Sequence, residues 1–291
     1  MTARVGADPA LFQYSTSHRI EHIGDGLLHK DLSPAALIGD ARDNRLEFLH
    51  DPRREPAVYR RLLGPSGIGP RCVGSGEDWI VVERIDGQPL WQIGEGDTWV
   101  TVARWLAQLH DRLADAETSG LPLVRHDATL AMRWRRRARD RGAPDSVLAA
   151  HERACARLLE LPPTLIHGDL YASNVLVGAA PSPPTGRFDS IDDVGVWPVD
   201  WELAGVGPGV LDVAALTAGW PDDSPVRAAM ESAYLGATAV GQSSPPLCLN
   251  DVAAARLYLC VQWLGSPAVW TPPEQHRHDW LAEARALAES I

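Results

Sequence analysis

Lysine is almost absent from this chain. The 291 residues include 27 basic side chains, and Lys30, in the stretch LLHKDLS, is the single lysine among them. A lysine ammonium is a compact charge with three rotatable donors, whereas an arginine guanidinium is a planar fork that is always charged. The exception therefore has two interpretations: a leftover surface charge, or a point charge that must reach a specific oxygen.

Long apolar runs and paired cysteines are also missing. No apolar run approaches the ~18 residues that cross a bilayer, and the N-terminus MTARVGADPALFQY has no charged start followed by an apolar core. The four cysteines, Cys72, Cys155, Cys248 and Cys260, form no CxxC pair, which argues against a structural zinc site and predicts free thiols. We therefore expect a soluble, cytoplasmic protein with no membrane contact.

Basic charge is in deficit as well. The net charge of -11 argues against nucleic acid as a partner, because neutralising phosphates requires basic patches. One local exception is RWRRRARDR at residues 133–141. Its arginines surround a helix rather than follow one stripe, so a solvated or ion-paired helix is the first interpretation. Contact with an anionic substrate group is the second.

The patterns that are present predict a strand-rich beginning and a helical remainder. Residues 27–32 and 79–85 are typical of strands, GDG at 24–26 of a hairpin turn, and residues 55–63 of a helix. Further helices are expected at 98–113, at 145–160 with Asp145 as its cap, and at 225–238, 249–264 and 276–289. The chain is therefore predicted to be an α+β protein, with a boundary near Asp86 and Gly87.

A non-helical segment interrupts the helical half. It comprises LIHGDLYASNVLVG, a loop rich in proline, glycine and serine, and VWPVDWE, which together predict a β-hairpin. Asp169 and Asn174 precede its first strand and Asp200 ends its second, so we expect their oxygens to converge. Magnesium selects carboxylate and amide oxygens, so Asn174 and Asp200 suit a Mg-nucleotide. Asp169 is then left to orient a nucleophile.

The same segment resembles part of a known family. HGDLYASN, residues 167–174, resembles the catalytic loop of the aminoglycoside phosphotransferase and choline kinase group, a branch of the protein-kinase-like fold. VDWE at 199–202 resembles the metal-binding segment of that group, and GVGPGVLDVAAL at 205–216 resembles its next element. The order of the motifs and the interval of about 25 residues between the first two are specific. The similarity extends from about Gln13 to Asp212.

This resemblance implies a bilobal protein-kinase-like fold, with a small strand-rich N-lobe and a larger, mostly helical C-lobe. Residues 1–87 would form the nucleotide-binding lobe and residues 88–291 the catalytic and substrate-binding lobe. The segment VVERIDG resembles the hinge, at about residues 83–88, where backbone groups of Glu83 and Ile85 would bind a purine edge.

The resemblance also assigns the single lysine. In kinase-like folds a strand lysine binds the α- and β-phosphates and pairs with a glutamate of the next helix. Lys30 and Glu55 lie at similar positions, so Lys30 is interpreted as the phosphate anchor.

One departure concerns the phosphate loop. The glycine-rich loop of protein kinases is absent, and YSTSH, residues 14–18, stands in its place. Ser15, Thr16 and Ser17 are nucleotide-binding candidates, since hydroxyls and backbone N–H groups also hold phosphates. An ordinary hairpin turn is the alternative.

The resemblance further implies a phosphoryl transfer from ATP or GTP. Asp169 would accept or orient the proton of a substrate hydroxyl, with Asn174 and Asp200 as Mg2+ ligands. His167 is expected to support the loop by hydrogen bonding rather than to act as a base. Asp212 is expected to brace the same loop.

The acceptor is expected between Asp169 and the C-terminal helices. These helices contain Trp263, Trp270, Glu274, His276, His278 and Trp280. Aromatic faces stack on sugars, bases or cations, although core packing is the default for most of the eleven tryptophans. Glu202, Trp263 and Trp270 are the substrate-contact candidates.

Three functions follow from this interpretation. The first is a small-molecule hydroxyl kinase that acts on an antibiotic, such as an aminoglycoside or a nucleoside antibiotic, and so confers resistance. A metabolic kinase for choline, ethanolamine, homoserine or a sugar is the second, and a nucleotide-binding pseudokinase is the third. A protein kinase is disfavoured, because no APE-like segment and no long activation segment follow Asp200.

Overall fold

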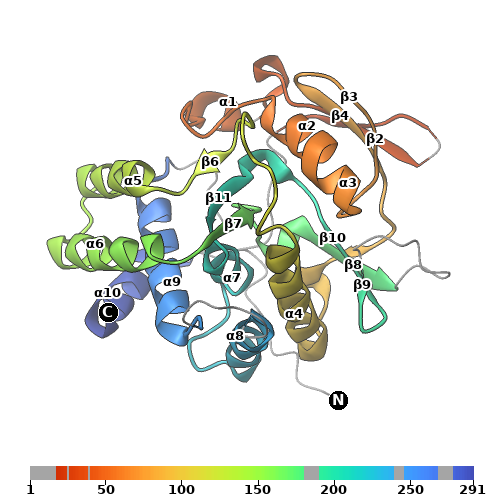
Figure 1. The fold of residues 1–291 in the computed structure, drawn as a ribbon. Helices are drawn as coiled ribbons and strands as arrows, with labels where there is room; N and C mark the ends of the chain where they lie inside the picture. The colour runs from red at the N-terminus through yellow and green to blue at the C-terminus, as the bar shows by residue number, and fades with distance from the viewer. Residues whose placement is uncertain (1–17, 25, 39, 180–189, 239–245, 268–277) are drawn as a thin grey trace.

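The computed structural model describes residues 18–24, 26–38, 40–179, 190–238, 246–267 and 278–291. Within these ranges the N-terminal part is rich in strands and the C-terminal part is mostly helical, as Figure 1 shows. The predicted α+β class is therefore confirmed. Among the helices that are described, none is both long and apolar enough to cross a membrane.

An antiparallel sheet forms the N-terminal part. Its strands are β1 (Ile20–His22), β2 (Leu27–Asp31), β3 (Cys72–Ser75) and β4 (Trp79–Glu83), in the spatial order β1-β2-β4-β3. Strands β2 and β4 are the two predicted ones, and β4 ends at Glu83, earlier than expected. Lys30 lies opposite Ile80 of β4 and is the one buried residue of β2. The alternation of a strand thus points the lysine inward.

Short helices follow this lysine strand. They are α1 (Asp40–Asn44), α2 (Arg54–Val58), a π-helical turn at Tyr59–Leu63, and α3 (Gly64–Ser66). The predicted helix at 55–63 is confirmed, with the π-helical turn as its second half. All five residues of α2 are buried, because the helix lies between β4 and the 3-10 turn Trp201–Leu203. Glu55 is carried on this helix.

Helices dominate the remainder. They are α4 (Gly96–Arg112), α5 (Ala128–Asp140), α6 (Asp145–Leu159), α7 (Val210–Leu216), α8 (Pro225–Thr238), α9 (Leu249–Gly265) and α10 (Trp280–Ser290). Helices α4, α6, α8, α9 and α10 agree with predicted helices within the described residues, and α5 carries the arginine-rich segment, whereas α7 was not predicted. Asp145 as a helix cap was wrong: Asp145 is the first helical residue and Pro144 takes the cap position. Helix α9 packs against α5, α6, α7 and α10 and thus lies at the centre of this part (Figure 1).

Two small sheets lie between the helices and fix the loops of interest. Their strands are β5 (Gln88–Pro89), β6 (Val124–Arg125), β7 (Pro163–Ile166), β8 (Val175–Ala179), β9 (Ser190–Ile191), β10 (Val194–Pro198) and β11 (Gly205–Pro208). The predicted hairpin is confirmed, since β8 pairs with β10 in antiparallel register. Strand β7 pairs with β11. The loop from β7 to β8 and the turn from β10 to β11 therefore connect the same two sheets and lie side by side.

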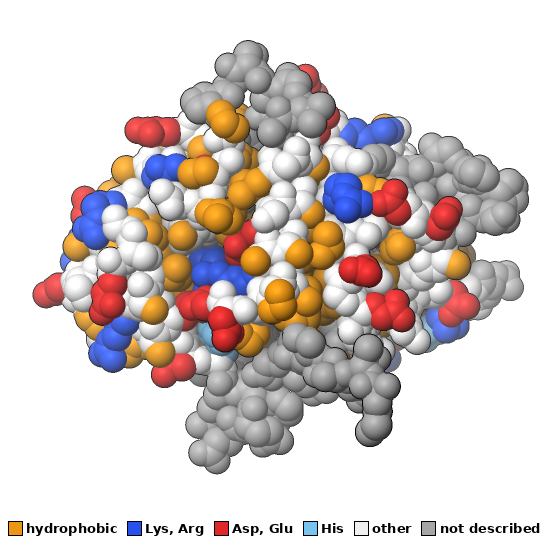
Figure 2. Space-filling view, turned by 90° about the horizontal axis from the view of Figure 1, so that it is seen from below, with side chains coloured by type: hydrophobic (Ala, Val, Ile, Leu, Met, Phe, Trp, Pro, Cys, Tyr) orange, Lys and Arg blue, Asp and Glu red, His pale blue; other side chains and the backbone are white. Residues whose placement is uncertain are grey.

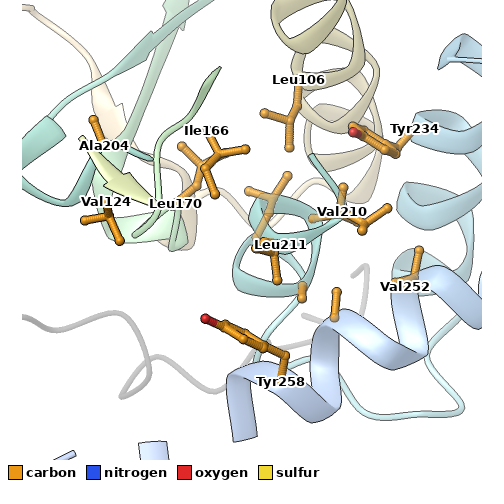
Figure 3. Close-up of a cluster of buried hydrophobic side chains, with 14 of the residues drawn as sticks. Leu106, Val124, Ile166, Leu170, Ala204, Val210, Leu211, Tyr234, Val252 and Tyr258 are labelled. Atoms are coloured by element: carbon orange, nitrogen blue, oxygen red, sulfur yellow. The ribbon is translucent and has the colours of Figure 1, made fainter. Parts of the chain in front are cut away.

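A continuous apolar core supports these loops. Figure 3 shows side chains from α4, α7, α8, α9 and the short strands that point toward one another, among them Leu106, Val210, Leu211, Tyr234, Val252, Ile166 and Leu170. In the part of the chain that the structure describes, six tryptophans are buried: Trp99, Trp105, Trp134, Trp197, Trp201 and Trp220. Core packing thus accounts for most of the tryptophans, as expected. Each fully buried aromatic ring stabilises the fold by about 2 to 3 kcal/mol.

The arginine-rich segment 133–141 lies on α5. Asp127 caps this helix by accepting a hydrogen bond from the Leu130 N–H at 3.0 Å. Arg137 donates to the Gly265 carbonyl at 2.8 Å, at the C-terminal end of α9, where cations are favoured. Arg135 pairs with Glu152 at 3.1 Å. These contacts fit the ion-paired interpretation of the segment.

The charge distribution on the surface and the state of the cysteines also bear on the predictions from sequence. Figure 2 shows one face on which acidic and basic side chains alternate with small apolar areas, so that face offers no continuous basic field. The four cysteines are free thiols, as expected. The pKa of the Cys155 thiol is raised to about 12 by burial, which keeps it protonated at neutral pH.

A buried histidine predicts how stability depends on pH. His151 on α6 is 1% exposed, its Nε2 lies 3.3 Å from Cys155 Sγ, and burial lowers its pKa to about 4. The unfolded chain binds this proton near pH 6.5 and the folded chain only near pH 4, so stability falls as pH drops through that window. Replacing His151 with Gln should reduce the stability lost between pH 7 and pH 5 by about 2 kcal/mol.

Urea unfolding at the two pH values measures this difference. His22→Gln, which makes the same substitution at an exposed position of β1, is the matched control. An equal pH dependence in His151→Gln and the unmutated protein would contradict the prediction.

Candidate active site

Lys30 joins three elements through one ammonium group. Its Nζ donates to Glu55 Oε2 at 2.8 Å and to Asp200 Oδ1 at 2.6 Å. Lys30 and Glu55 are 7% and 2% exposed, respectively. The other oxygen of Glu55, Oε1, accepts the Trp201 N–H at 3.1 Å. The structure thus brings the predicted lysine and glutamate into contact, and adds Asp200 to the pair.

Electrostatics keep this lysine charged. Burial lowers the pKa of Lys30, but the carboxylates of Asp200 and Glu55 outweigh burial and hold the pKa well above its ordinary value. Burial raises the pKa of Glu55, and the Lys30 ammonium opposes that rise. A buried ammonium with two carboxylate partners is a fixed positive charge that can hold an anionic oxygen nearby.

The loop from residue 167 to 174 holds its own polar groups in place. Asn174 Nδ2 donates to the Asp169 carbonyl at 2.8 Å and to Asp169 Oδ2 at 3.1 Å. The Tyr171 N–H donates to the Asp169 carbonyl at 2.8 Å, and the Val199 N–H donates to the Asn174 carbonyl at 2.9 Å. These bonds connect the loop to the strand end that leads to Asp200. The loop with Asp169 and Asn174 is thus bonded to Val199, the residue before Asp200, as the predicted convergence requires.

Negative charge accumulates around Asp169. Its pKa is raised well above its ordinary value by burial, then by the nearby carboxylates of Asp200 and Glu202. Repulsion of this kind favours a cation between the carboxylates.

The donor atoms suit magnesium. Among the described residues, no group of three or more His, Cys, Asp or Glu side chains is placed to hold a metal by itself. Mg2+ needs only one or two protein oxygens, because substrate phosphates and water complete its shell. Asn174 uses its amide nitrogen within the loop, and its amide oxygen accepts only a long bond from Ser173 Oγ at 3.5 Å, so that oxygen can serve as a ligand. Asn174 and Asp200 therefore fit the ion.

His167 and Asp212 hold the loop in place through hydrogen bonds to its backbone and to Val199. His167 Nε2 donates to the Val199 carbonyl at 2.9 Å, and His167 Nδ1 accepts the Asp169 N–H at 3.3 Å. Both ring nitrogens are thus engaged in a neutral tautomer, and burial lowers the pKa of the ring. Asp212 accepts the N–H groups of His167 at 2.7 Å and Gly168 at 2.9 Å. These contacts are those expected of residues that support the loop, and their role in activity stays a prediction.

Adding a single methyl group at Gly168 should have a severe effect. Its φ is +80°, and a Cβ there would lie 2.3 Å from the Leu203 carbonyl oxygen. Gly168→Ala should therefore cost the left-handed strain of about 1 to 2 kcal/mol and, in addition, displace the loop from the turn 201–203. Activity and urea stability measure the two consequences.

Gly142 offers a matched control for this glycine. It has a φ of +88° with nothing within 4 Å of its Cβ position. Gly142→Ala should show the strain alone. Equal losses of stability in the two variants would contradict a role for the Leu203 contact.

Asp200 occupies an unusual backbone conformation. Its φ and ψ are 67° and 63°, in the left-handed region that aspartate tolerates better than most residues. Such strain is typical of functional turns that the surroundings hold in place. Here the surroundings are the ammonium of Lys30 and the Trp201 N–H bond to Glu55.

Glu202 turns toward the N-terminal part. Its Oε2 lies 3.0 Å from His18 Nδ1, and its side chain is 23% exposed. His18 is 1% exposed and stacks on His50 with ring centroids 5.4 Å apart. Glu202 thus lies near the charged centre, and its contact with an acceptor stays a prediction.

Aromatic side chains connect the loop to the last helices. Trp263 of α9 donates its Nε1 to the Tyr171 hydroxyl at 2.5 Å. The rings of Trp263 and Trp280 stack at 5.2 Å with an angle of 7° between their planes. Trp263 therefore lies beside the candidate active site, whereas Trp270 lies outside the described residues.

The nucleotide-binding candidates are only partly described. Ser15, Thr16 and Ser17 lie outside the described residues. The Glu83 N–H donates to the Arg71 carbonyl at 2.9 Å, so it takes part in the sheet. The carbonyl of Glu83 and the backbone of Ile85 remain as candidates for binding a purine edge.

Several residues at this centre escape prediction from sequence. His18 is the last residue of YSTSH, but nothing in its spacing indicates the contact with Glu202. Tyr171 lies inside HGDLYASN, where its position two residues after Asp169 is the only signal. Arg54 precedes Glu55 and bonds only to backbone carbonyls in the contacts described.

Comparison with known proteins identifies the family. The profile described as the phosphotransferase enzyme family matches residues 42–243. No curated protein matches the chain.

Solved structures share the fold. Choline kinase LicA from Streptococcus pneumoniae has a TM-score of 0.64 and 15% identity, with 96% of this chain and 92% of that chain covered. The GDP complex of aminoglycoside 2'-phosphotransferase-IIIa has a TM-score of 0.58 and 14% identity, with coverage of 96% and 90%. Macrolide 2'-phosphotransferase MphH from Brachybacterium faecium has a TM-score of 0.56 and 17% identity, with coverage of 86% and 82%. The chain therefore has a kinase-like fold and belongs to the phosphotransferase enzyme family.

Proposed function

We propose that this protein is a Mg-nucleotide-dependent O-phosphotransferase that phosphorylates a hydroxyl group of a small molecule, with an antibiotic as the acceptor. One observation carries the proposal: the Lys30 ammonium, paired with Glu55 and Asp200, lies at the same centre as the bonded pair Asp169 and Asn174. A pseudokinase usually lacks one of these groups. The alternative of a binding protein without transfer is therefore weaker.

Each residue has a defined task in the proposed reaction. Phosphoryl transfer passes through a loose transition state, so positioning and charge neutralisation dominate catalysis. Lys30 would hold phosphate oxygens, and Asp169 would accept or orient the proton of the acceptor hydroxyl. Asn174 and Asp200 would hold Mg2+, which when bound neutralises charge on the phosphates. His167 and Asp212 would keep the Asp169 backbone in place.

We place the nucleotide on the N-terminal part of the chain. Residues 1–87 would form its lobe, residues 83–88 the hinge, and residues 88–291 the catalytic and acceptor-binding lobe. The donor is ATP or GTP, and the backbone of Glu83 and Ile85 would bind the base.

The acceptor side favours a hydroxylated molecule that also carries positive charge. Glu202 contributes to the negative charge around Asp169, and Trp263 with Trp280 presents aromatic rings beside Tyr171. Carboxylates and aromatic rings both attract cations. Amine-bearing antibiotics such as aminoglycosides meet this description, and resistance would be the result.

A second candidate has the same support. The aromatic pair Trp263 and Trp280 also suits a small amino alcohol, such as choline or ethanolamine. In that case the protein would be a metabolic kinase.

A mass-spectrometric screen separates these functions. Mg-ATP or Mg-GTP is incubated with pooled aminoglycosides, nucleoside antibiotics, macrolides, choline, ethanolamine, homoserine and sugars, and Asp169→Asn serves as the control. One acceptor that gains a phosphoryl group only with the unmutated protein identifies substrate class and donor together. Nucleotide binding without any transfer to a broad acceptor panel would support the pseudokinase, and no nucleotide binding at all would contradict the proposal.

A further inference from the structure

Arg54, the residue before Glu55, has an environment unusual for a charged side chain. It is 4% exposed. Its Nε donates to the Pro122 carbonyl at 2.6 Å, and its Nη1 donates to the carbonyls of Leu49 and Glu202, each at 2.6 Å. The guanidinium thus connects the start of α2 to the segment just before it, at Leu49, and to two backbone segments that are distant in sequence, at Pro122 and Glu202.

Burying the charged side chain of Arg54 costs free energy, which its hydrogen bonds must offset. At 4% exposure the charge is taken out of water, and this burial lowers the pKa of Arg54. Charged groups are rarely buried unless hydrogen bonds in good geometry compensate for lost hydration. The planar fork of arginine can donate in several directions at once, whereas a lysine ammonium at the end of a flexible stem cannot match that geometry.

The contacts of Arg54 and Glu55 meet at one turn. Arg54 binds the carbonyl of Glu202, while Glu55 Oε1 accepts the N–H of Trp201. Both partners belong to the 3-10 turn Trp201–Leu203, which directly follows Asp200. The start of α2 is therefore held against this turn by two adjacent side chains, and Glu55 Oε2 remains directed at Lys30.

We propose that Arg54 is a positioning residue for phosphoryl transfer. By bonding to the carbonyls of Pro122 and Glu202, it fixes the start of α2 and thereby keeps Glu55 in contact with Lys30 and the turn after Asp200. This inference rests on the proposed function for its effect on turnover. Its effect on the Lys30 environment does not depend on that function.

A double-mutant cycle tests the coupling. Arg54→Lys keeps the charge but removes the fork, and it should lower kcat/KM for the Mg-nucleotide at least about tenfold. Glu55→Gln should lower it as well, and Arg54→Lys should add little in that background, because Arg54 acts through Glu55. A residue with a merely structural role would instead give additive losses.

Arg53 provides the matched control. Its side chain is 63% exposed and pairs with Asp51 on the surface. Arg53→Lys should leave kcat/KM unchanged. Urea unfolding of all variants shows which of them are folded under assay conditions.

A second readout needs no turnover. Because Lys30 is the single lysine, protein grown with lysine labelled with carbon-13 at Cε gives one side-chain NMR signal. In Arg54→Lys the introduced lysine adds a second signal, so Arg54→Gln and Arg54→Met are the variants for this measurement. The Lys30 signal should shift toward its position in Glu55→Gln, and Arg53→Gln should leave it in place.

The two readouts separate the possible failures. If the unmutated protein binds no Mg-nucleotide but the Lys30 signal shifts as described, the proposed function fails and the role of Arg54 in placing Glu55 stands. If folded Arg54 variants keep both the Lys30 signal and the unmutated kcat/KM, the positioning role is wrong. Additive losses in the cycle with an unshifted signal would also overturn it.

Discussion

Asp169→Asn should lower kcat by at least about a thousandfold while leaving Mg-nucleotide affinity within a few-fold of the unmutated protein. The substitution keeps the size of the side chain and removes its ability to accept a proton. Burial and the carboxylates of Asp200 and Glu202 raise the pKa of Asp169. A raised pKa makes the carboxylate a better proton acceptor, so its loss falls on the chemical step.

Two measurements separate this role from a structural one. Single-turnover phosphoryl transfer reports the chemical step, and equilibrium binding of a Mg-nucleotide reports the phosphate site. Asp140→Asn, at an exposed position on α5, is the matched control and should retain full activity. Retained turnover in Asp169→Asn would show that another group handles the proton.

The loop around Asp169 could be predicted because its chemistry is local. HGDLYASN places Asp169 and Asn174 in one short segment, and the hydrogen bonds between them follow from that closeness. The flanking apolar strands carry a clear hairpin pattern, and the observed register of β8 and β10 brings Asp200 to the same end. Sequence and structure agree here because spacing alone decides which groups meet.

The pair of Lys30 and Glu55 required more than spacing. The residues are 25 positions apart, and α1 and several turns lie between them. Only the resemblance to kinase-like folds placed them together, and it did not indicate that Asp200 would share the ammonium. The π-helical turn at Tyr59–Leu63 also has no signature in the helical pattern of this segment.

Contacts to backbone atoms mark the limit of prediction from sequence. The carbonyls that bind Arg54 belong to Leu49, Pro122 and Glu202, and every residue of the chain carries such a carbonyl. No residue type therefore signals the partner. The contact of His18 with Glu202 joins two side chains, but it too could not be predicted, since it depends on how the N-terminal part lies against the turn after Asp200.

Lys30→Arg should lower kcat/KM for the Mg-nucleotide about a hundredfold, although the positive charge is kept. The ammonium lies 2.8 Å from Glu55 Oε2 and 2.6 Å from Asp200 Oδ1, in a site where Lys30 is only 7% exposed. A guanidinium is larger and planar, so it must displace one of the two carboxylates or move the turn that carries Asp200. Displacing Asp200 or moving its turn also shifts a group proposed to hold Mg2+, and displacing Glu55 breaks its pair with the cation.

An exchange in the opposite direction, arginine to lysine at an exposed position, is the control. Arg19 pairs with Glu21 at 2.8 Å and its side chain is 71% exposed, so Arg19→Lys should have no effect on kcat/KM. Nucleotide titration in the kinase assay gives KM and kcat for both variants, and urea unfolding confirms that both are folded. If Lys30→Arg retains full kcat/KM, a fork can replace the point charge, and the scarcity of lysine in this chain carries no functional meaning. If it loses activity while Arg19→Lys does not, activity requires a compact ammonium between the two carboxylates at this position.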